Sequence, residues 1–334
     1  MQLVRSGAVA LAIMVAVATT GWAQQRSYSV STVGKHADEV LGVFVNDANT
    51  MVATCSLDET VKIWSLPDGK EIRTLRGHTA QVNNVSFSGD DKLLASASSD
   101  RTVRIWDVAT GNALQVLRGH TAEVIGVYFS PVDGSNLVAS TSFDKTVKFW
   151  DANLGVEAKT LRGHTMQTNN VAYSYDGRFI ASCSDDRSVR VWSTDLSKKE
   201  PLMVLSSHQA PVLSCLFSFD SKYLATADQN GVVKIWSMPS GDLVRSINAH
   251  TDLVQDVAFA EDNRTLVTAS LDKFVKMWDI TTGQNLLSQN VNVEVWSLDV
   301  TSNASLIVLG CADGTVRYMK ESATEAGRSN RGGR

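Results

Sequence analysis

The sequence lacks the short patterns that mark most catalytic and cofactor sites. It contains no GxSxG, HExxH or P-loop pattern, and its four cysteines form no CxxC or CxxCH pattern. These absences remove the usual signatures of nucleophilic hydrolases, zinc proteases, nucleotide hydrolases and covalent haem sites. The cysteines remain open to disulfide pairing in an exported protein, but their isolated positions favour buried, small apolar residues. The sequence therefore predicts no enzyme, no cofactor and no metal site.

The sequence also lacks an excess of positive charge. The chain has a formal net charge of −4, and no window combines a basic stripe with interleaved aromatic residues. A nucleic-acid-binding domain usually shows a basic excess, so no nucleic-acid partner is predicted. The hydrophobic content of 43% predicts a packed globular core.

Only one long apolar run occurs, and it lies near the N-terminus. Arg5 precedes an apolar segment at residues 8–18, and small residues stand before a cleavage point after Ala23. This order is typical of a secretory signal peptide, which we assign to residues 1–23. An uncleaved N-terminal anchor is the alternative, although the run is shorter than the roughly 20 residues of a membrane-spanning helix. No second apolar run follows, so no membrane span is predicted after cleavage.

The N-terminal segment predicts a periplasmic or secreted protein. Asn263 and Asn303 begin sequences that match glycosylation acceptors, but these matter only in a eukaryotic secretory route. The simple signal peptide and the lack of a disulfide framework favour a bacterial periplasm.

Two residue types recur through the chain with a fixed spacing. Tryptophans stand at positions 64, 106, 150, 192, 236 and 278, at intervals of 42 or 44 residues. All six histidines of the chain precede these tryptophans by 28 residues, or by 30 in the third case. A period of 20 to 50 residues indicates a repeat architecture.

Each repeat has the pattern of several short strands. In the second unit, apolar positions in residues 82–87, 93–98 and 102–106 are separated by Asp, Gly and Ser. A further strand is predicted over residues 113–117, and nothing in the unit has helical periodicity. Four strands in about 42 residues match one blade of a β-propeller.

The repeated segments resemble the WD40 family. Arg76-Gly77-His78 and Trp106-Asp107 carry the resemblance, and related segments recur in the other units. The resemblance covers residues 27–320 and implies an all-β, seven-bladed propeller with four antiparallel strands per blade. Its motifs are specific for the fold but not for a function, because one fold hosts many functions.

The seventh unit is altered and needs a strand from elsewhere. Val291 replaces the histidine and Met319 replaces the tryptophan, with the 28-residue spacing kept. No outer strand follows Lys320, whereas residues 29–36 resemble the outer strand at residues 71–78. We therefore predict that the N-terminal strand joins the last blade and closes a propeller domain of residues 24–320. Residues 321–334 are polar and are predicted to be a disordered tail.

The histidines invite a catalytic or metal-binding interpretation, but each occupies the same position of a different repeat. The family resemblance implies instead a buried hydrogen-bond network in each blade, formed by His, a turn Asp, a Ser or Thr, and Trp. Asn230 replaces the Asp of the fifth blade and the seventh lacks His and Trp, so incomplete networks are expected there. The assigned network residues are His36, Asp58, Trp64, His78, Asp100, Trp106, His120, Asp144, Trp150, His164, Asp186, Trp192, His208, Trp236, His250, Asp272 and Trp278.

Trp296 is the one tryptophan outside both the repeat pattern and the signal peptide. By the family resemblance, residues that enter the first strand of a blade, or precede the turn Asp, line one face near the central channel. An apolar patch with an aromatic anchor is typical of an interaction site, whereas the alternative is that these residues pack against neighbouring loops. The predicted partner-binding residues are Trp296, Leu41, Leu57, Leu253, Leu271, Phe143, Ile125, Glu39 and Glu294.

These observations predict a non-catalytic scaffold that binds one or more proteins. We expect a monomeric propeller within a larger complex, such as an electron-transfer or envelope-assembly complex. The alternative is a propeller enzyme or small-ligand binder that uses the central channel. Such proteins usually depart from repeat regularity, but the only insertions here are about two residues each, near residues 131–135 and 197–200.

Overall fold

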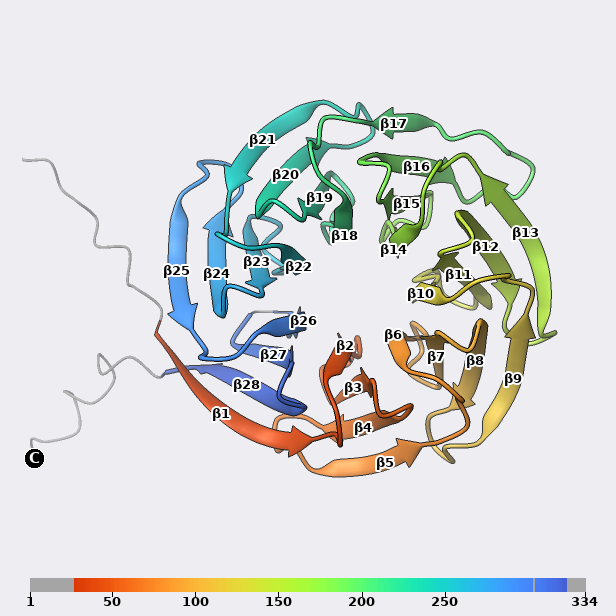
Figure 1. Cartoon of the computed structure of the whole chain (residues 1–334), viewed down its shortest axis with the longest axis horizontal. Coiled ribbons are helices and arrows are strands. Elements are labelled where there is room, and N and C mark those ends of the chain that lie inside the picture. Colours follow the sequence, from red (N-terminus) through yellow and green to blue (C-terminus); the bar gives the residue numbers. More distant parts are fainter. Residues whose placement is uncertain (1–26, 303, 323–334) are drawn as a thin grey trace, which may run out of the picture.

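The computed structural model describes residues 27–302 and 304–322. The predicted signal peptide, its cleavage point after Ala23 and nearly all of the predicted tail lie outside the described residues. The described chain forms seven four-stranded antiparallel sheets around a central axis (Figure 1). This arrangement confirms the predicted seven-bladed propeller.

Each blade contains four strands, which follow one another outward from the axis. Blade 1 has β2 (Val40–Val45), β3 (Met51–Ser56), β4 (Val61–Ser65) and β5 (Glu71–Leu75). Blade 2 has β6 (Val82–Phe87), β7 (Leu93–Ser98), β8 (Thr102–Asp107) and β9 (Ala113–Arg118). Blade 3 has β10 (Val124–Phe129), β11 (Leu137–Ser142), β12 (Thr146–Asp151) and β13 (Val156–Arg162).

The remaining blades follow the same plan. Blade 4 has β14 (Thr168–Tyr173), β15 (Phe179–Ser184), β16 (Val189–Ser193) and β17 (Met203–Leu205). Blade 5 has β18 (Val212–Phe217), β19 (Tyr223–Asp228), β20 (Val232–Ser237) and β21 (Leu243–Asn248). Blade 6 has β22 (Val254–Phe259), β23 (Thr265–Ser270), β24 (Phe274–Asp279) and β25 (Asn285–Asn290). Blade 7 has β26 (Val295–Val300), β27 (Leu306–Cys311), β28 (Thr315–Glu321) and β1 (Tyr28–Lys35).

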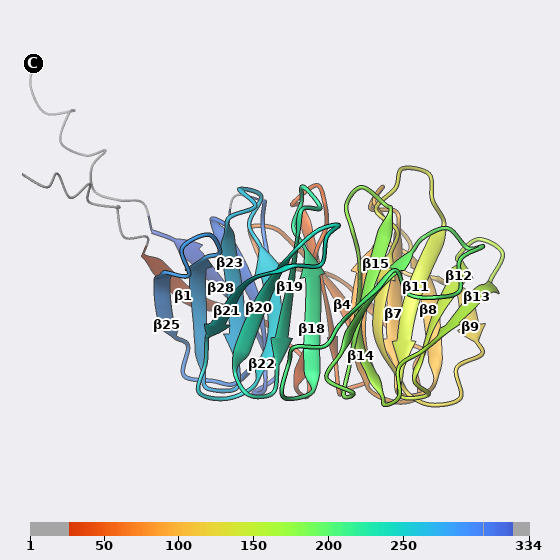
Figure 2. The same ribbon diagram turned by 90° about the horizontal axis from the view of Figure 1, so that it is seen from above.

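The hydrophobic core lies between the blades. Alternate residues of a strand point to opposite faces of its sheet, and both faces of the inner strands of a blade are covered by neighbouring blades. The second strand of each blade is therefore buried along nearly its whole length, as in β7 and β15. One core cluster joins Ala95 and Ile105 of blade 2 to Val124 and Trp150 of blade 3. Figure 2 shows the blades from the side, with the connecting loops at the two ends of a short cylinder.

The N-terminal strand closes the ring as predicted. β1 pairs antiparallel with β28, from Tyr28 opposite Glu321 to Lys35 opposite Thr315, and it lies outside β28 in Figure 1. The hydroxyl of Tyr28 donates a hydrogen bond to the carbonyl oxygen of Ala304 at 2.9 Å. The predicted domain end at Lys320 is one residue short, because pairing with Tyr28 holds Glu321 in the last strand.

The cysteines behave as small core residues. Cys55, Cys183, Cys215 and Cys311 are all buried and unpaired. Across residues 27–302 and 304–322, no helix reaches the length and apolar character needed to cross a membrane.

Candidate functional site

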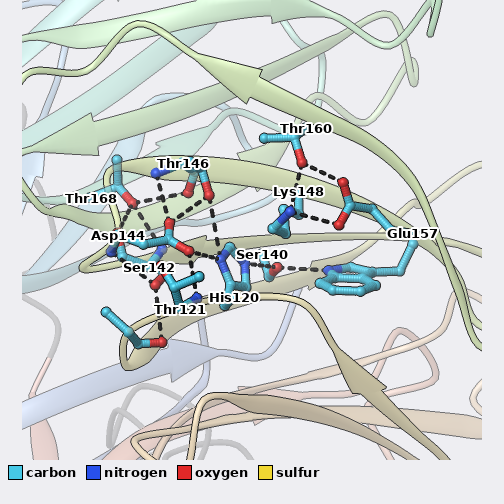
Figure 3. A network of polar contacts seen from close by, with 12 residues as sticks. His120, Thr121, Ser140, Ser142, Asp144, Thr146, Lys148, Glu157, Thr160 and Thr168 are labelled. Atoms are coloured by element: carbon cyan, nitrogen blue, oxygen red, sulfur yellow. Dashed lines mark hydrogen bonds and ion pairs between the residues drawn. The ribbon is translucent and has the colours of Figure 1, made fainter.

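The repeated histidines form hydrogen-bond networks inside the blades. In blade 3, His120 Nδ1 lies 2.8 Å from Asp144 Oδ2, and His120 Nε2 lies 2.8 Å from Ser140 Oγ (Figure 3). The indole Nε1 of Trp150 donates to the same Ser140 oxygen at 2.8 Å. An ionised carboxylate can only accept, so Nδ1 donates to Asp144, and a neutral imidazole accepts the Ser140 proton at Nε2. Every polar atom of the imidazole is thereby engaged within the blade.

The same geometry recurs in the other blades that match the pattern. His36, His78, His164 and His250 each lie between 2.8 and 3.1 Å from an oxygen of their turn aspartate. All six histidines are buried, and each belongs to a separate blade. Among the described residues, no group of three or more His, Cys, Asp or Glu is arranged to hold a metal ion.

The turn aspartates of these networks are strongly acidic. Burial by itself raises the pKa of Asp144, but hydrogen bonds from His120 and Thr146 outweigh it and hold that pKa well below its usual range. The pKa values of Asp58, Asp100 and Asp186 are lowered by the same combination of contacts. These carboxylates therefore stay ionised at pH values at which a free aspartate gains its proton.

Blade 5 corrects one sequence-based expectation. Asn230 replaces the usual aspartate, but the network is complete because Asp228 Oδ2 lies 2.7 Å from His208 Nδ1. Asp228 occupies the position of Ser184 in blade 4, two residues before the turn carboxylate. Its second oxygen accepts the backbone N–H groups of Asn230 and Val232 at 2.9 and 3.1 Å. The expectation of an incomplete network in blade 5 was wrong because the side chain of Asp228, the last residue of β19, reaches the histidine nitrogen that the turn aspartate binds in the other blades.

Blade 7 has an apolar replacement for the network. Val291 and Met319 stand at the histidine and tryptophan positions, and Leu309 stands at the hydroxyl position. All three are buried in one hydrophobic cluster. The network is therefore absent from blade 7, as the sequence predicted, but no buried polar partner is left behind by the three changes.

The first strand of every blade begins with a β-bulge, and the seven bulge residues form a ring at one end of the central channel. Each bulge is seen as a register shift between the first and second strands, for example between Val40 and Gly42 in blade 1 and between Val295 and Ser297 in blade 7. All seven bulge residues are partly buried. In blade order they are Leu41, Asn83, Ile125, Asn169, Leu213, Gln255 and Trp296.

The bulge ring alternates between apolar and amide residues. Blades 1, 3, 5 and 7 carry an apolar residue, whereas blades 2, 4 and 6 carry Asn or Gln. The amide of Asn83 donates to the backbone oxygen of Val124 in the next blade at 2.8 Å. Asn169 donates in the same way to the oxygen of Val212 at 2.9 Å. The alternation gives the propeller a structural period of two blades.

Seven blades cannot alternate without a break, and the break lies where the ring closes. Blades 7 and 1 are both of the apolar type, so Trp296 and Leu41 occupy the same register position on adjacent first strands. These strands are also linked by a hydrogen bond from the backbone N–H of Val43 to Ser297 Oγ at 3.1 Å. The 7–1 junction is thus the one place in the bulge ring where two apolar residues are not separated by an amide.

The structure brings the nine predicted partner-binding residues to this end of the propeller. Trp296, Leu41 and Ile125 are bulge residues, and all nine are partly buried. The other six belong to residue pairs that are joined by a backbone hydrogen bond. In each pair, the residue before the turn aspartate donates its N–H to the carbonyl oxygen of the residue before the first strand of the blade. These pairs are Leu57 with Glu39, Phe143 with Glu123, Leu271 with Leu253, and Ala312 with Glu294.

Two features of this ring were missed from the sequence. In blade 6 the bulge residue is Gln255, whereas Leu253 lies two residues earlier, outside the bulge ring. The amide residues Asn83 and Asn169 were not assigned any role. Their spacing of 86 residues, which Gln255 repeats, is the signal that could have revealed the two-blade period.

Two carboxyl groups on the inner strands join blades without a basic partner. Asp256 accepts hydrogen bonds from Ser214 Oγ at 3.0 Å and Ser297 Oγ at 2.7 Å. Asp299 accepts the backbone N–H of Val45 at 2.7 Å. Burial raises the pKa of Asp256 to about 6 and that of Asp299 to about 7. In Asp299, the nearby negative charges of Asp256 and Asp47 add to the effect of burial.

We expect the melting temperature to fall as the pH rises from 5 to 8. Because the pKa values of Asp256 and Asp299 lie above the unfolded value near 4, the folded state binds more protons, and raising the pH through this window lowers stability. The lowered pKa of His250 has the opposite effect. Below the usual pKa of a histidine it makes stability rise with the pH, but it is one group against two. A loss of roughly 5 °C or more is expected in thermal unfolding followed by circular dichroism. A melting temperature that rises steadily from pH 5 to pH 8 would contradict this assignment.

Comparison with known protein families gives one match. The family model described as "WD domain, G-beta repeat" matches residues 27–65, 69–107, 111–151, 155–193, 199–237 and 241–279. The first matched segment runs from β1 of blade 7 to β4 of blade 1, so the sequence repeat is offset by one strand from the blade. Blade 7 has no matched segment for β26 to β28, in keeping with its apolar replacement of the network. No curated protein matches the chain.

Proposed function

Since the chain belongs to the WD40 family, whose propellers commonly serve protein interaction, we propose that it is a non-catalytic scaffold that binds a partner protein through the bulge end. The binding surface is centred on Trp296 and Leu41 at the 7–1 junction. Asn83, Asn169 and Gln255 separate the other apolar bulge residues from one another. The adjacent apolar pair at the junction is the observation that carries this proposal.

The chemistry of Trp296 supports its role as the anchor. It is partly buried, and its indole Nε1 has no hydrogen-bond partner, unlike the Nε1 atoms of the six repeat tryptophans. Packing of Trp296 is therefore not reinforced by the hydrogen bond that fixes its counterparts. Tryptophan is also enriched among residues that dominate binding energy at interfaces.

One acidic residue precedes each of the two strands that carry this apolar pair. Glu39 precedes β2, and Glu294 precedes β26, where its carboxylate lies 3.8 Å from Lys273 Nζ. At this distance and exposure the ion pair stabilises the fold little, which leaves Glu294 available to a partner. We propose a partner segment that presents an apolar side chain flanked by Lys or Arg.

The proposed setting is the periplasm or the extracellular space. This proposal is supported by the signal-peptide pattern, which consists of Arg5, the apolar run at residues 8–18 and the small residues before position 23. A non-catalytic role is supported by the histidines, since all six are engaged in hydrogen bonds within their blades.

The test is affinity capture from the envelope fraction with the wild type, Trp296→Ala and Leu213→Ala side by side. Leu213 is the matched control, because it occupies the same bulge position but lies between Asn169 and Gln255. We expect Trp296→Ala to reduce capture of a specific partner by about tenfold or more, while Leu213→Ala retains it and both variants stay folded. Equal capture by all three proteins would overturn the proposed surface, and a large fall in the melting temperature of Trp296→Ala would place the indole in the core.

Recovery of the full-length chain only from the cytoplasm would overturn the proposed export.

A further inference from the structure

A cavity occupies the central channel toward the end opposite the bulge ring. It has a volume of about 110 Å³ and is lined by residues of all seven inner strands or the turns that follow them. Trp296 and the other bulge residues do not line it. The cavity is therefore separate from the proposed partner-binding surface.

The two-blade period shapes this cavity. Three residues after the bulge, blades 1, 3, 5 and 7 carry Phe44, Tyr128, Leu216 and Asp299, which all line the cavity. At the same position, blades 2, 4 and 6 carry only Ser86, Ala172 and Ala258, which are buried and do not line it. Large side chains thus enter the channel from every second blade, and the 7–1 junction places Asp299 on the strand next to Phe44.

Aromatic rings form much of the wall. Phe44 and Tyr128 meet edge to face, with ring centroids 5.4 Å apart. Tyr175 and Phe219 are stacked at 4.5 Å in the turns that follow β14 and β18. The face of an aromatic ring carries partial negative charge and attracts cations.

The charged groups of the cavity are all acidic. Asp47, Asp256 and Asp299 line it, the other titratable lining groups are Tyr128, Tyr175 and Cys215, and no Lys, Arg or His is among the lining residues. The hydrogen bonds of Asp256 and Asp299 come from hydroxyl and backbone N–H groups. Buried carboxylates without a cation are costly in the ionised form, so a cation that enters the cavity gains from charges that the fold leaves uncompensated.

We propose that this cavity binds a primary ammonium group carried on a short aliphatic chain. Asp299 and Asp47 provide the opposite charge, and the rings of Phe44, Tyr128 and Tyr175 provide the apolar and cation-attracting wall. The volume suits roughly four to five non-hydrogen atoms, in proportion to benzene, which is accommodated by a cavity of about 150 Å³. This inference goes beyond the proposed protein interaction and does not depend on it.

Two sources present this chemistry: a free alkylamine and the side chain of a lysine. Both place an ammonium at the end of a four- or five-atom chain, and the channel opening decides which can enter. A bound ammonium favours the ionised carboxylates, whose pKa values burial raises in the empty cavity. Binding should therefore release protons near pH 6.5 and strengthen as the pH rises from 5.5 to 8.

The experiment is titration calorimetry of the purified protein with n-butylammonium, with n-butanol as the neutral analogue of matched size. We expect saturable binding of butylammonium, no comparable binding of butanol, and a heat that varies with the ionisation enthalpy of the buffer. A peptide with a central lysine, tested beside its norleucine counterpart, separates the sources: binding of the peptide assigns the site to a lysine side chain, and binding of butylammonium alone assigns it to a free amine.

Substitutions test whether butylammonium binds in the cavity. Asp299→Asn should weaken butylammonium binding by roughly tenfold or more through the loss of a charge-assisted contact. Asp133→Asn removes the same charge from an exposed loop outside the cavity and should leave binding unchanged. Phe44→Leu, which keeps an apolar side chain but removes the ring, should also weaken binding and serves if Asp299→Asn does not fold. Equal binding of butanol and butylammonium, a pH-independent affinity, or unchanged binding in Phe44→Leu would each overturn the proposal.

Discussion

Removal of residues 27–34 should lower the melting temperature by roughly 10 °C or more. This deletion takes away nearly all of β1, and with it the backbone pairing to β28 and the buried ring of Tyr28, which is 8% exposed. Loss of a large buried aromatic side chain alone costs about 3–5 kcal/mol, and the exposed edge of β28 adds unpaired backbone groups. Thermal unfolding followed by circular dichroism measures the effect.

Single substitutions test whether the loss of stability arises because β1 no longer closes the ring or because the chain is shorter. Tyr28→Ala should reproduce a substantial part of the loss, because its ring packs in the cluster between blades 6 and 7 and its hydroxyl reaches Ala304. Ser31→Ala is the control, since Ser31 is exposed on the same strand. An unchanged melting curve after the deletion would mean that the ring holds without its N-terminal strand.

Asp228→Ser should destabilise blade 5 by about 3 kcal/mol, and a second substitution should restore much of that loss. The single change removes the carboxylate that binds His208 and leaves a buried imidazole N–H without its acceptor. Adding Asn230→Asp recreates the arrangement of Ser184 and Asp186 in blade 4, where Asp186 Oδ2 lies 2.9 Å from His164 Nδ1. The double variant should therefore be more stable than Asp228→Ser by about 2 kcal/mol.

The wild type, the two single variants and the double variant form a double-mutant cycle, which measures the energetic coupling between positions 228 and 230. Asn230→Asp alone is expected to change the melting temperature little, because Asn230 is exposed and Asp228 already binds His208. Denaturant unfolding of the wild type, both single variants and the double variant gives the interaction energy. Additive effects, with no recovery in the double variant, would show that the two positions do not substitute for one another.

The sequence by itself determined the fold. The recurrence of His and Trp at fixed spacing, with four strand-like segments in each unit, specified the blade and the number of blades. The similarity of residues 29–36 to an internal outer strand specified how the ring closes. These features were readable because each depends on local alternation and on repeats along the chain.

Other features were decided only by the tertiary structure. Asp228 ends β19 and Asn230 lies in the turn that follows, but the Asp228 carboxylate reaches the histidine nitrogen that a turn aspartate binds in the other blades. The family pattern alone does not show this. The bulge of blade 6 falls between Val254 and Asp256, so Gln255 occupies the bulge ring, whereas Leu253 lies before the strand begins. The cavity brings together Phe44, Tyr128 and Asp299, which lie far apart in sequence and meet only because seven inner strands surround one axis.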